Sequence, residues 1–542
     1  MVRLSIIGGL DGIGMNMMCF QHKKEMFVLD AGIMFPDGDM HGIDKIIPSF
    51  SYFEEHKNDI KGIFFTHGHE DHIGAVAHFI EKINVPIYGT KLTLGMVEHK
   101  LIEHGLEDYK LIEINEDSLI KFKYFKLEFV RVSHSIPDGV MTVIHSPVGT
   151  IVHSGDFKID YTPIDEKVID LKRIADIGKK GVTLFMSDST NAVKKGHTKS
   201  EKHVGDAFEK EFAGVEGRLL VATFASNIHR VQQVINVGKK FGRKICFVGR
   251  SMENTSSIAR RLGYLDFEDE DIIQLNKVDD YPDKEVLVLA TGSQGEPFAA
   301  LTRIARGDHP MFQTKVGDTV IMSALPIPGN EKMVFANINN LGRAGVNVIY
   351  EAGSKMHVSG HAYQEELKLM LELVKPKFFI PVHGEFRHLQ AHKELAEDLG
   401  IVDEILMPEN GDQLDIEKKK VTFAGRLDLP RIYIDSNSNC FENQKIIDDR
   451  QAMARNGAVS VVVFMDEDRR RIEDVVFNMK GISNPAKDFM YGLKDSIIDQ
   501  FNYRLQSGKI SPENIEKDLS IIVRKYMSKK IGKWPVVIPS IV

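Results

Sequence analysis

A dense group of possible metal ligands lies in residues 66–72, which read THGHEDH. The chain has 21 histidines in 542 residues, yet His67, His69 and His72 all fall in this segment, beside Glu70 and Asp71. His67 and His69 are two residues apart, so in an extended segment both side chains point to the same side. Asp71 and His72 follow as a second donor pair. Four such donors exceed what one tetrahedral ion needs once distant ligands join, so the segment predicts two neighbouring metal ions.

Further aspartate and histidine residues follow short apolar runs, each of which predicts a β-strand. The runs are MFVL, GIFFT, LEFVRVS, GTIVHSG, VTLFMS and KFFIPV, and the residues that end them are Asp30, His67, His134, Asp156, Asp188 and His383. One such residue alone would be interpreted as a turn former or a cap. Because rigid scaffolds display chemistry on loops at strand ends, the repeated pattern predicts one shared site.

The elements that position these residues fall into three parts. From about residue 207 the strand-like runs RLLVATFAS, KICFVGRS, EVLVLATGSQGEP, DTVIMSALPIPG and NVIYEAGS alternate with amphipathic stretches such as IHRVQQVINVGKKFG. This alternation predicts βα units on a mostly parallel sheet, inserted into the first domain. The expected limits are 1–206 and 366–425 for the two parts of the first domain, 207–365 for the insertion, 426–450 for a linker and 451–542 for a small C-terminal α/β domain.

Composition places the chain among soluble globular proteins, with 43% apolar and 27% charged residues. The three cysteines, Cys19, Cys246 and Cys440, are far apart, which excludes a thiolate cage and indicates a reducing, intracellular compartment. No run approaches the about 18 apolar residues of a membrane span. The net charge of −8 means that a polyanionic substrate needs a local basic path, for which Lys158, Arg230 and Lys355 are candidates.

The pattern His-x-His-x-Asp-His resembles the signature of the metallo-β-lactamase superfamily, and the other strand-end residues match that family's remaining motifs in order. The resemblance implies an αββα sandwich with two zinc ions per subunit, or manganese in their place. One ion would be held by His67, His69 and His134. The other would be held by Asp71, His72 and His383, with Asp156 bridging the two. Asp30 would orient either a ligand histidine or the loop that carries Asp71.

The insertion resembles that of the β-CASP nucleases. Asp188 in SDST, His361 in HVSGH and His383 in PVHGE match motifs of that group. The segments GGLDGIGMN, DAGIMFP, IYGTKLTLG, TFASNIHR, TGSQGEP and PVHGE together are similar to the bacterial ribonuclease J family, over residues 5 to 425. The C-terminal part is similar, with weaker motifs, to that family's small last domain. The family usually has Glu and Lys where this chain has Gly12 and Met15, which affects expected substrate contacts.

A phosphate pocket is expected from two segments. TFASNIHR places Ser226 and Asn227 at a strand-to-helix turn, where backbone N–H groups favour phosphate. In HVSGH, the glycine lets backbone approach a phosphate closely. By family resemblance, the residues that line the pocket for the 5′ phosphate are Ser226, Asn227, His357, Val358, Ser359, Gly360 and His361. His361 would also contact the scissile phosphate, and the catalytic set would be Asp71, His72, Asp156, Asp188 and His361.

The resemblance therefore implies a cytoplasmic, zinc-dependent ribonuclease that acts on single-stranded RNA in RNA maturation and decay. It would cut internally and from the 5′ end, prefer a 5′ monophosphate, and use metal-bound hydroxide on the phosphodiester. The implied partners are further copies in a homodimer or homotetramer, a paralogue, or other RNA-decay proteins, with no membrane. The alternatives are a DNA nuclease of the β-CASP group, a hydrolase of small esters or thioesters, and a structural partner in an RNA-degradation complex.

Overall fold

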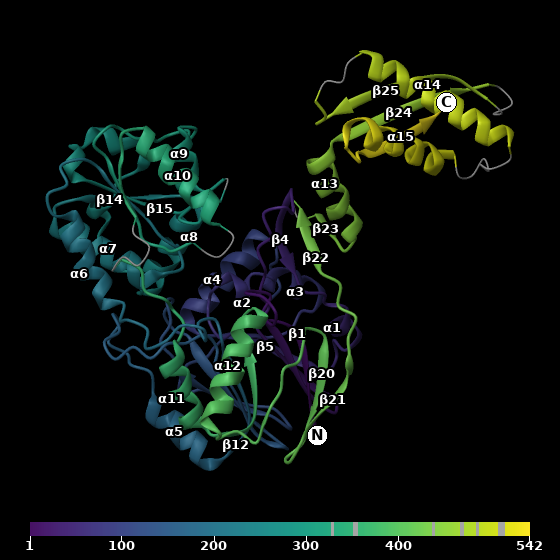
Figure 1. Cartoon of the computed structure of the whole chain (residues 1–542). Coiled ribbons are helices and arrows are strands. Elements are labelled where there is room, and N and C mark those ends of the chain that lie inside the picture. The colour runs from purple at the N-terminus through teal and green to yellow at the C-terminus, as the bar shows by residue number, and fades with distance from the viewer. Residues whose placement is uncertain are drawn as a thin grey trace. The chain divides into compact units, whose positions relative to one another are not determined.

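The computed structural model describes residues 1–296, 298–326, 330–350, 356–435, 439–466, 471–483, 487–507 and 515–542 (Figure 1). Contacts divide the chain into two compact units. The first unit contains Met1–Phe35 and Lys45–Ile432, and the second contains Pro36–Asp44 and Tyr433–Val542. Each unit has a hydrophobic core of its own.

Two β-sheets face each other in the first unit. In order across the first sheet, the strands are β21 (Val421–Arg426), β20 (Asp412–Ile416), β1 (Val2–Gly8), β2 (Met17–His22), β3 (Glu25–Leu29), β5 (Ile60–Phe64), β6 (Ile87–Gly89) and β7 (Leu111–Glu113). Across the second sheet they are β19 (Glu404–Ile405), β18 (Pro376–Val382), β12 (Val182–Asp188), β11 (Gly149–His153), β10 (Val140–Ser146), β9 (Lys126–Arg131) and β8 (Leu119–Lys121). Strand β4 (Ile43–Ile47) contacts the segment after β3 through a bridge between Met34 and Ile46.

The core of this sandwich lies between the two sheets, where Phe27 and Phe64 of the first sheet meet Phe129 and Ile144 of the second. Helices cover the outer faces. The second sheet is covered by α5 (Leu171–Lys180), α11 (Gln364–Val374) and α12 (Phe386–Leu399), which share a second core with it. Beside the first sheet lie α1 (Ser51–Glu55), α2 (Glu70–Ile73), α3 (Val76–Lys82) and α4 (Lys91–Glu103). These layers confirm the predicted αββα sandwich.

All six apolar runs that were predicted as strands are strands, namely β3, β5, β9, β11, β12 and β18. Strand β3 runs parallel to β5, and β12 runs parallel to both β11 and β18. Parallel neighbours deliver their carboxyl ends to the same edge of a sheet, so the residues after these strands meet there.

The insertion has a five-stranded parallel sheet, as the sequence predicts. Its strands, in order, are β14 (Lys244–Val248), β15 (Val286–Ala290), β13 (Leu219–Ala222), β16 (Thr319–Met322) and β17 (Asn347–Ile349). Helices α9 (Ala300–Arg306) and α10 (Glu331–Arg343) pack on one face. Helix α7 (Ile228–Lys240) packs on the other, with Gly238 against Leu287. The remaining helices are α6 (Lys202–Phe212), α8 (Arg250–Leu262) and the 3-10 turns Asp269–Asp271, Leu275–Asp280 and Asp283–Glu285.

The second unit contains the C-terminal α/β domain. Its sheet has the order β25 (Ile472–Lys480), β24 (Ala458–Met465) and β26 (Val536–Ile541), and α14 (Lys487–Gln506) and α15 (Ile515–Ile531) pack on it. The stretch expected to be a linker contains β22 (Ile432–Asp435), β23 (Asn439–Phe441) and the first part of α13 (Gln444–Asn456). Ile447 is the one buried side chain recorded for α13, so this helix has no apolar stripe to reveal it. The predicted domain limits stay predictions.

Among the described residues, no helix is both long enough and apolar enough to cross a membrane.

Candidate two-metal centre

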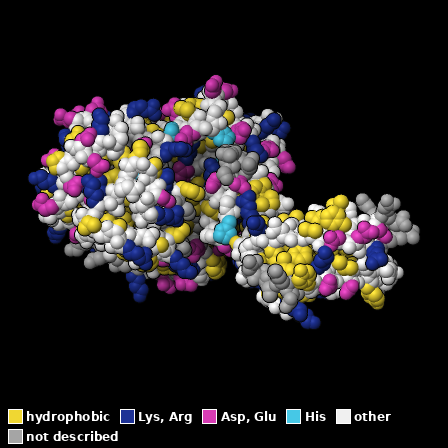
Figure 2. Space-filling model, turned by 90° about the horizontal axis from the view of Figure 1, so that it is seen from above, with side chains coloured by type: hydrophobic (Ala, Val, Ile, Leu, Met, Phe, Trp, Pro, Cys, Tyr) yellow, Lys and Arg dark blue, Asp and Glu magenta, His cyan; other side chains and the backbone are white. Residues whose placement is uncertain are grey.

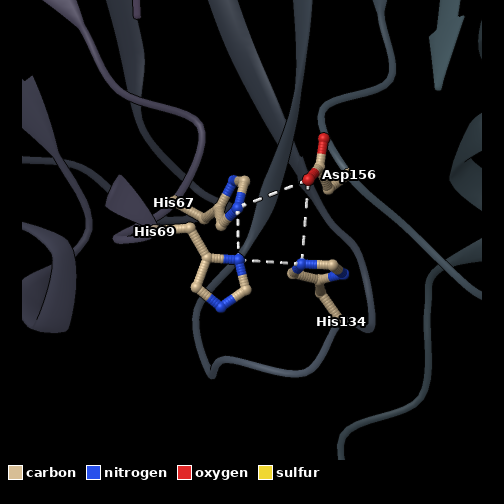
Figure 3. Close-up of side chains that lie close together, drawn as sticks. All are labelled: His67, His69, His134 and Asp156. Carbon is tan, nitrogen blue, oxygen red and sulfur yellow. Dashed lines mark hydrogen bonds and ion pairs between the residues drawn. The ribbon is translucent and has the colours of Figure 1, made fainter. Parts of the chain in front are cut away.

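Four donor groups meet in a first cluster, which Figure 3 shows with its side chains turned toward one another. His67 and His69 come from the loop after β5, and His134 follows β9. His69 Nδ1 lies 3.0 Å from His67 Nε2 and 3.1 Å from His134 Nε2. Asp156 Oδ2 lies 3.6 Å from His67 Nε2 and 3.8 Å from His134 Nε2.

A second cluster shares Asp156 with the first. It adds Asp71 and His72 from α2 and His383, which follows β18. Asp71 Oδ2 lies 3.0 Å from His383 Nε2 and 3.7 Å from His72 Nε2. Asp156 Oδ2 lies 3.3 Å from His72 Nε2 and 3.7 Å from His383 Nε2. A single carboxylate oxygen therefore lies between the two sets of donors.

The donor set fits two divalent cations. Two ligand atoms at about 2.0–2.1 Å from a tetrahedral zinc ion are about 3.3–3.4 Å apart, and the separations above lie around that value. The donors of the first cluster are also in the right protonation state for a metal. Burial, reinforced by His72, lowers the pKa of His67, and burial lowers that of His69 to about 4, so both imidazoles keep a lone pair for a metal. Although burial opposes its charge, the imidazoles of His383 and His72 hold the pKa of Asp156 well below its usual range.

Further hydrogen bonds orient the ligand rings. Asp30 Oδ2 lies 2.8 Å from His72 Nδ1, and both Asp30 oxygens accept hydrogen bonds from Thr66, at 2.8 Å from its N–H and 3.0 Å from its hydroxyl. His134 Nδ1 donates to the carbonyl of Gly360 at 2.6 Å. With Nδ1 of both rings occupied in this way, Nε2 is left for a metal, which is the arrangement that metal-binding histidines use.

Asp188 and His361 lie at the edge of the centre. His361 Nδ1 is 2.8 Å from Asp188 Oδ2 and 3.9 Å from Asp156 Oδ2. Burial opposes a charged His361, but Asp188 and then Asp156 outweigh it and raise the pKa of His361. Thr190 donates its N–H and hydroxyl to Asp188 Oδ1, and its hydroxyl also lies 2.6 Å from His383 Nδ1. Two candidate catalytic residues thus share a network with a candidate metal ligand.

The expected pocket residues belong to two neighbouring segments. Asn227 accepts the N–H of Arg230 and begins α7, after the half-buried Ser226. Arg230 donates to the carbonyl of Val358 at 3.2 Å and lies 3.3 Å from His357 Nδ1. Arg230 therefore joins the turn of α7 to residues 357–361.

The glycine of this second segment is packed against the metal centre. A Cβ on Gly360 would lie 2.7 Å from His134 Cε1, so no larger residue fits beside this ligand ring. Ser359 accepts a hydrogen bond from Asn191 Nδ2 at 2.6 Å, and Asn191 also donates to the carbonyl of His361 at 3.1 Å.

Two of the basic residues expected on an RNA path are buried, which corrects that expectation. Arg230 is fully buried, with its guanidinium against Glu201 at 2.9 and 3.1 Å. Lys158 is 3% exposed and lies 3.2 Å from Asp160 Oδ2. A side chain in a buried ion pair has no capacity left for a phosphate backbone. The third, Lys355, lies outside the described residues.

The face of the molecule in Figure 2 carries Lys and Arg side chains interspersed with Asp and Glu. Among the described residues that this view shows, charged side chains of one sign therefore do not form a separate patch.

The two departures from the resemblance lie beside the centre. The N–H of Gly12 donates to the carbonyl of Gly384 at 3.0 Å, next to His383. Met15 is 6% exposed and has a φ of 52°, in the left-handed region. Glu70, between the two ligand pairs, forms an ion pair with Lys100 instead of pointing at the clusters.

Sequence reasoning missed the residues that support the site: Thr66, Thr190, Asn191, Thr198 and Glu201. Thr198 and Asn191 both donate to the carbonyl of His361, and Glu201 pairs with Arg230. The sequence offers one signal for such residues, a hydroxyl or amide side chain directly after a strand that ends in a candidate site residue, as in SDSTN.

Four family models match consecutive parts of the chain. They are the metallo-beta-lactamase superfamily over residues 16–195, the beta-CASP domain of ribonuclease J over 216–341, the Zn-dependent metallo-hydrolase RNA specificity domain over 345–408, and the ribonuclease J C-terminal domain over 445–542. A protein named Ribonuclease J from Thermus thermophilus is 40% identical over 100% of this chain and 95% of its own length. The chain belongs to the ribonuclease J family.

Other relatives agree. Ribonuclease J from Helicobacter pylori (strain B128) is 40% identical over 99% of this chain and 79% of its own length, and Ribonuclease J 1 from Streptococcus pyogenes is 39% identical over 99% and 96%. A solved structure of a protein of unknown function from Enterococcus faecalis has a TM-score of 0.54 at 15% identity, covering 76% of this chain and 99% of its own, which shows the fold alone. Family membership confirms the predicted fold class and a metal-dependent nuclease of the metallo-hydrolase type. The RNA specificity match indicates RNA binding.

Proposed function

We propose that this member of the ribonuclease J family hydrolyses phosphodiester bonds of single-stranded RNA at a two-metal centre. It cuts internally and also degrades from the 5′ end, with preference for a 5′ monophosphate. The observation that carries the proposal is the position of Asp156 Oδ2, which lies 3.3 to 3.8 Å from imidazoles of both donor clusters. A shared carboxylate is what a pair of neighbouring cations requires.

Zinc is the proposed metal, with manganese as the alternative, because the donors are imidazoles and carboxylates without a thiolate. His67, His69 and His134 would hold one ion, Asp71, His72 and His383 the other, and Asp156 both. When bound, two such cations lower the pKa of a water toward neutrality and offset negative charge at the phosphate.

The protein's own residues keep this centre in shape. Asp30 and Thr66 fix the ring of His72, and the Gly360 carbonyl fixes that of His134. Gly360 and His361 lie in the same segment. The hydrogen bond from His134 to Gly360 therefore connects this segment directly to the metal centre. Asp188 accepts the Nδ1 proton of His361, which leaves Nε2 to contact the scissile phosphate or the leaving oxygen.

The pocket for the 5′ phosphate is proposed to lie where α7 begins and residues 357–361 pass. The N-terminus of α7 and the hydroxyls of Ser226 and Ser359 supply donors of the kind that phosphate needs. Arg230 acts there through position: it is buried and holds the carbonyls of Ser323 and Val358, at 2.8 and 3.2 Å.

The remaining expectations stay predictions: a homodimer or homotetramer, association with a paralogue or other RNA-decay proteins, a cytoplasmic location, and roles in ribosomal RNA processing and messenger RNA decay.

The test compares RNA of one sequence with a 5′ monophosphate, triphosphate or hydroxyl, together with matched single-stranded DNA. Wild type should degrade the monophosphate RNA fastest and the DNA slowest. The double variant Asp71→Ala/His72→Ala should lose metal and hydrolysis, whereas Glu70→Gln, in the same loop, should keep both. Undiminished RNA hydrolysis by the double variant would contradict the proposed metal mechanism. Equal rates on DNA and RNA would contradict the assignment of RNA as the substrate but not the metal site.

A further inference from the structure

A third group of metal-binding side chains shares no residue with the centre above. His78 and Glu81 lie on α3, three residues apart, so both project from one face of that helix. His104 is the C-cap residue of α4, and α3 packs against α4. The three side chains thus come together only because the two helices are neighbours.

The donor atoms are close to a coordinating arrangement. Glu81 Oε2 lies 3.1 Å from His104 Nε2, and one donor atom from each of the three residues lies within 4.8 Å of the others. The rings of His78 and His104 are 4.7 Å apart between centroids, at an angle of 75°. Ligand atoms around a tetrahedral zinc ion are about 3.3–3.4 Å apart. The contact between Glu81 and His104, at 3.1 Å, is close to that length.

The environment of His78 is a second, independent reason to expect a ligand at this cluster. It is 6% exposed, yet neither of its ring nitrogens has a hydrogen-bond partner within the described part of the chain. Burial, with help from Lys45 and His104, lowers the pKa of His78 to about 4, so the ring is neutral and carries a free lone pair.

The neighbouring charged residues Lys82 and Glu81 do not supply a partner for the ring of His78. Lys82, also on α3, is committed to Glu54, with Nζ 2.8 Å from Oε1. Glu81 offsets the positive charges that face His78, and its carboxylate is half exposed. The position opposite the protein is therefore open to a water ligand.

We propose that His78, Glu81 and His104 bind a third divalent transition-metal ion, with zinc as the best match and water as the fourth ligand. Two imidazoles and one carboxylate with an open position form a recognised zinc donor set. The ion would fasten α3 to the end of α4. Because α3 begins at Val76, four residues after His72, the ion would restrain the helix that follows the ligand loop.

The experiment counts zinc on the full-length chain. Metal-free wild type, His104→Ala and Glu81→Gln are loaded with zinc alone, freed of excess by gel filtration and analysed for metal per chain. Both substituted residues lie at the surface side of the cluster, so these variants should fold, and circular dichroism checks it. The matched control is His145→Ala. His145 forms a half-buried pair with Glu128, as His104 pairs with Glu81, but it belongs to no such three-residue group among the described residues.

We expect His104→Ala and Glu81→Gln to bind about one zinc ion per chain fewer than wild type and His145→Ala. In the Asp71→Ala/His72→Ala background, which impairs the two-metal centre, the same deficit should persist. Zinc should also raise the melting temperature more in wild type than in His104→Ala. Equal zinc content in all four proteins would overturn the proposal, whatever their activity on RNA.

Discussion

Asp30 Oδ2 lies 2.8 Å from His72 Nδ1, on the side of the ring opposite the metal cluster. Asp30 has a φ of 60°, in the left-handed region that residues with a Cβ rarely adopt, and His383 at the end of β18 has a φ of 57°. Such strain persists only where surrounding contacts impose it, and it concentrates at functional sites. The two hydrogen bonds from Thr66 to Asp30 are such contacts.

Replacing Asp30 tests this relationship. In Asp30→Asn the amide has a similar volume but lacks the charge that fixes the tautomer of His72. We expect metal affinity and RNA hydrolysis to fall about 10–100-fold, as for other partners of metal-binding histidines. Titration with zinc and a competing chelator measures the affinity. Glu70→Gln is the control, and a loss of equal size in it would mean that any loss of negative charge near the ligand loop has the same effect.

Asp156→Asn should affect both metal ions at once. Its Oδ2 lies between the two clusters, so the variant should lose metal from each and slow RNA hydrolysis by more than about 100-fold. Metal analysis and hydrolysis of one labelled RNA measure the two effects. A variant that keeps full metal content would show that Asp156 does not bridge the ions.

The buried pair of Arg230 and Glu201 should be important for stability. Removing one partner of a buried ion pair typically costs about 3–5 kcal/mol, because the other charge is left unpaired. We expect Arg230→Met and Glu201→Gln each to lower the free energy of unfolding by about that amount. Their double variant should lose less than the sum.

Lys240→Met provides the control for that pair. Lys240 Nζ lies 2.8 Å from Glu209 Oε2 at the surface, where such a pair contributes at most about 1 kcal/mol. Urea unfolding of all four variants measures the differences. If Arg230→Met and Lys240→Met lowered the free energy of unfolding by the same amount, the buried pair would not be what holds α7 against residues 357–361.

Ser359→Ala should weaken the preference for a 5′ monophosphate. The hydroxyl that would contact the phosphate is lost, and so is the acceptor for Asn191. A hydrogen bond to a charged group contributes about 1.5–3 kcal/mol, so we expect a loss of roughly 10–100-fold in the ratio of rates on monophosphate and hydroxyl RNA. Internal cleavage of a circular RNA, which has no 5′ end, serves as the internal control. A variant that loses circular-RNA cleavage and keeps the monophosphate preference would contradict the assignment.

His392 predicts a pH dependence of stability. It is fully buried on α12, with Nδ1 3.0 Å from the hydroxyl of Ser189, and burial lowers its pKa to about 3. The unfolded chain takes up a proton at about pH 6.5 and the folded chain only near the lowered pKa, so the free energy of unfolding falls as the pH falls between these values. The slope reaches about 1.4 kcal/mol per pH unit from this residue.

His392→Gln should make that slope shallower. The measurement is urea unfolding at a series of values from about pH 5 to about pH 7. His203→Gln, at an exposed position, should leave the slope as in wild type. Parallel slopes for wild type and His392→Gln would mean that the ring takes up its proton without unfolding.

The candidate ligands could be found from the sequence because each carries a local signal. His67, His69, Asp71 and His72 lie within one segment, and the other candidates directly follow strands whose apolar runs are readable by themselves. Parallel pairing of those strands then brings their ends together, a consequence of the fold class and not of details of packing. For this reason the six strands and the parallel sheet of the insertion were predicted correctly.

Only the tertiary structure decided which charged residues are available. Arg230 and Lys158 look in the sequence like solvated residues near loops, but packing buries both against carboxylates. His78 and His104 lie on different helices, so no spacing rule connects them, and it is the contact between α3 and α4 that brings them together. The physical reason is that chain position determines periodicity and local geometry, whereas burial and distant pairing depend on which surfaces exclude water from one another.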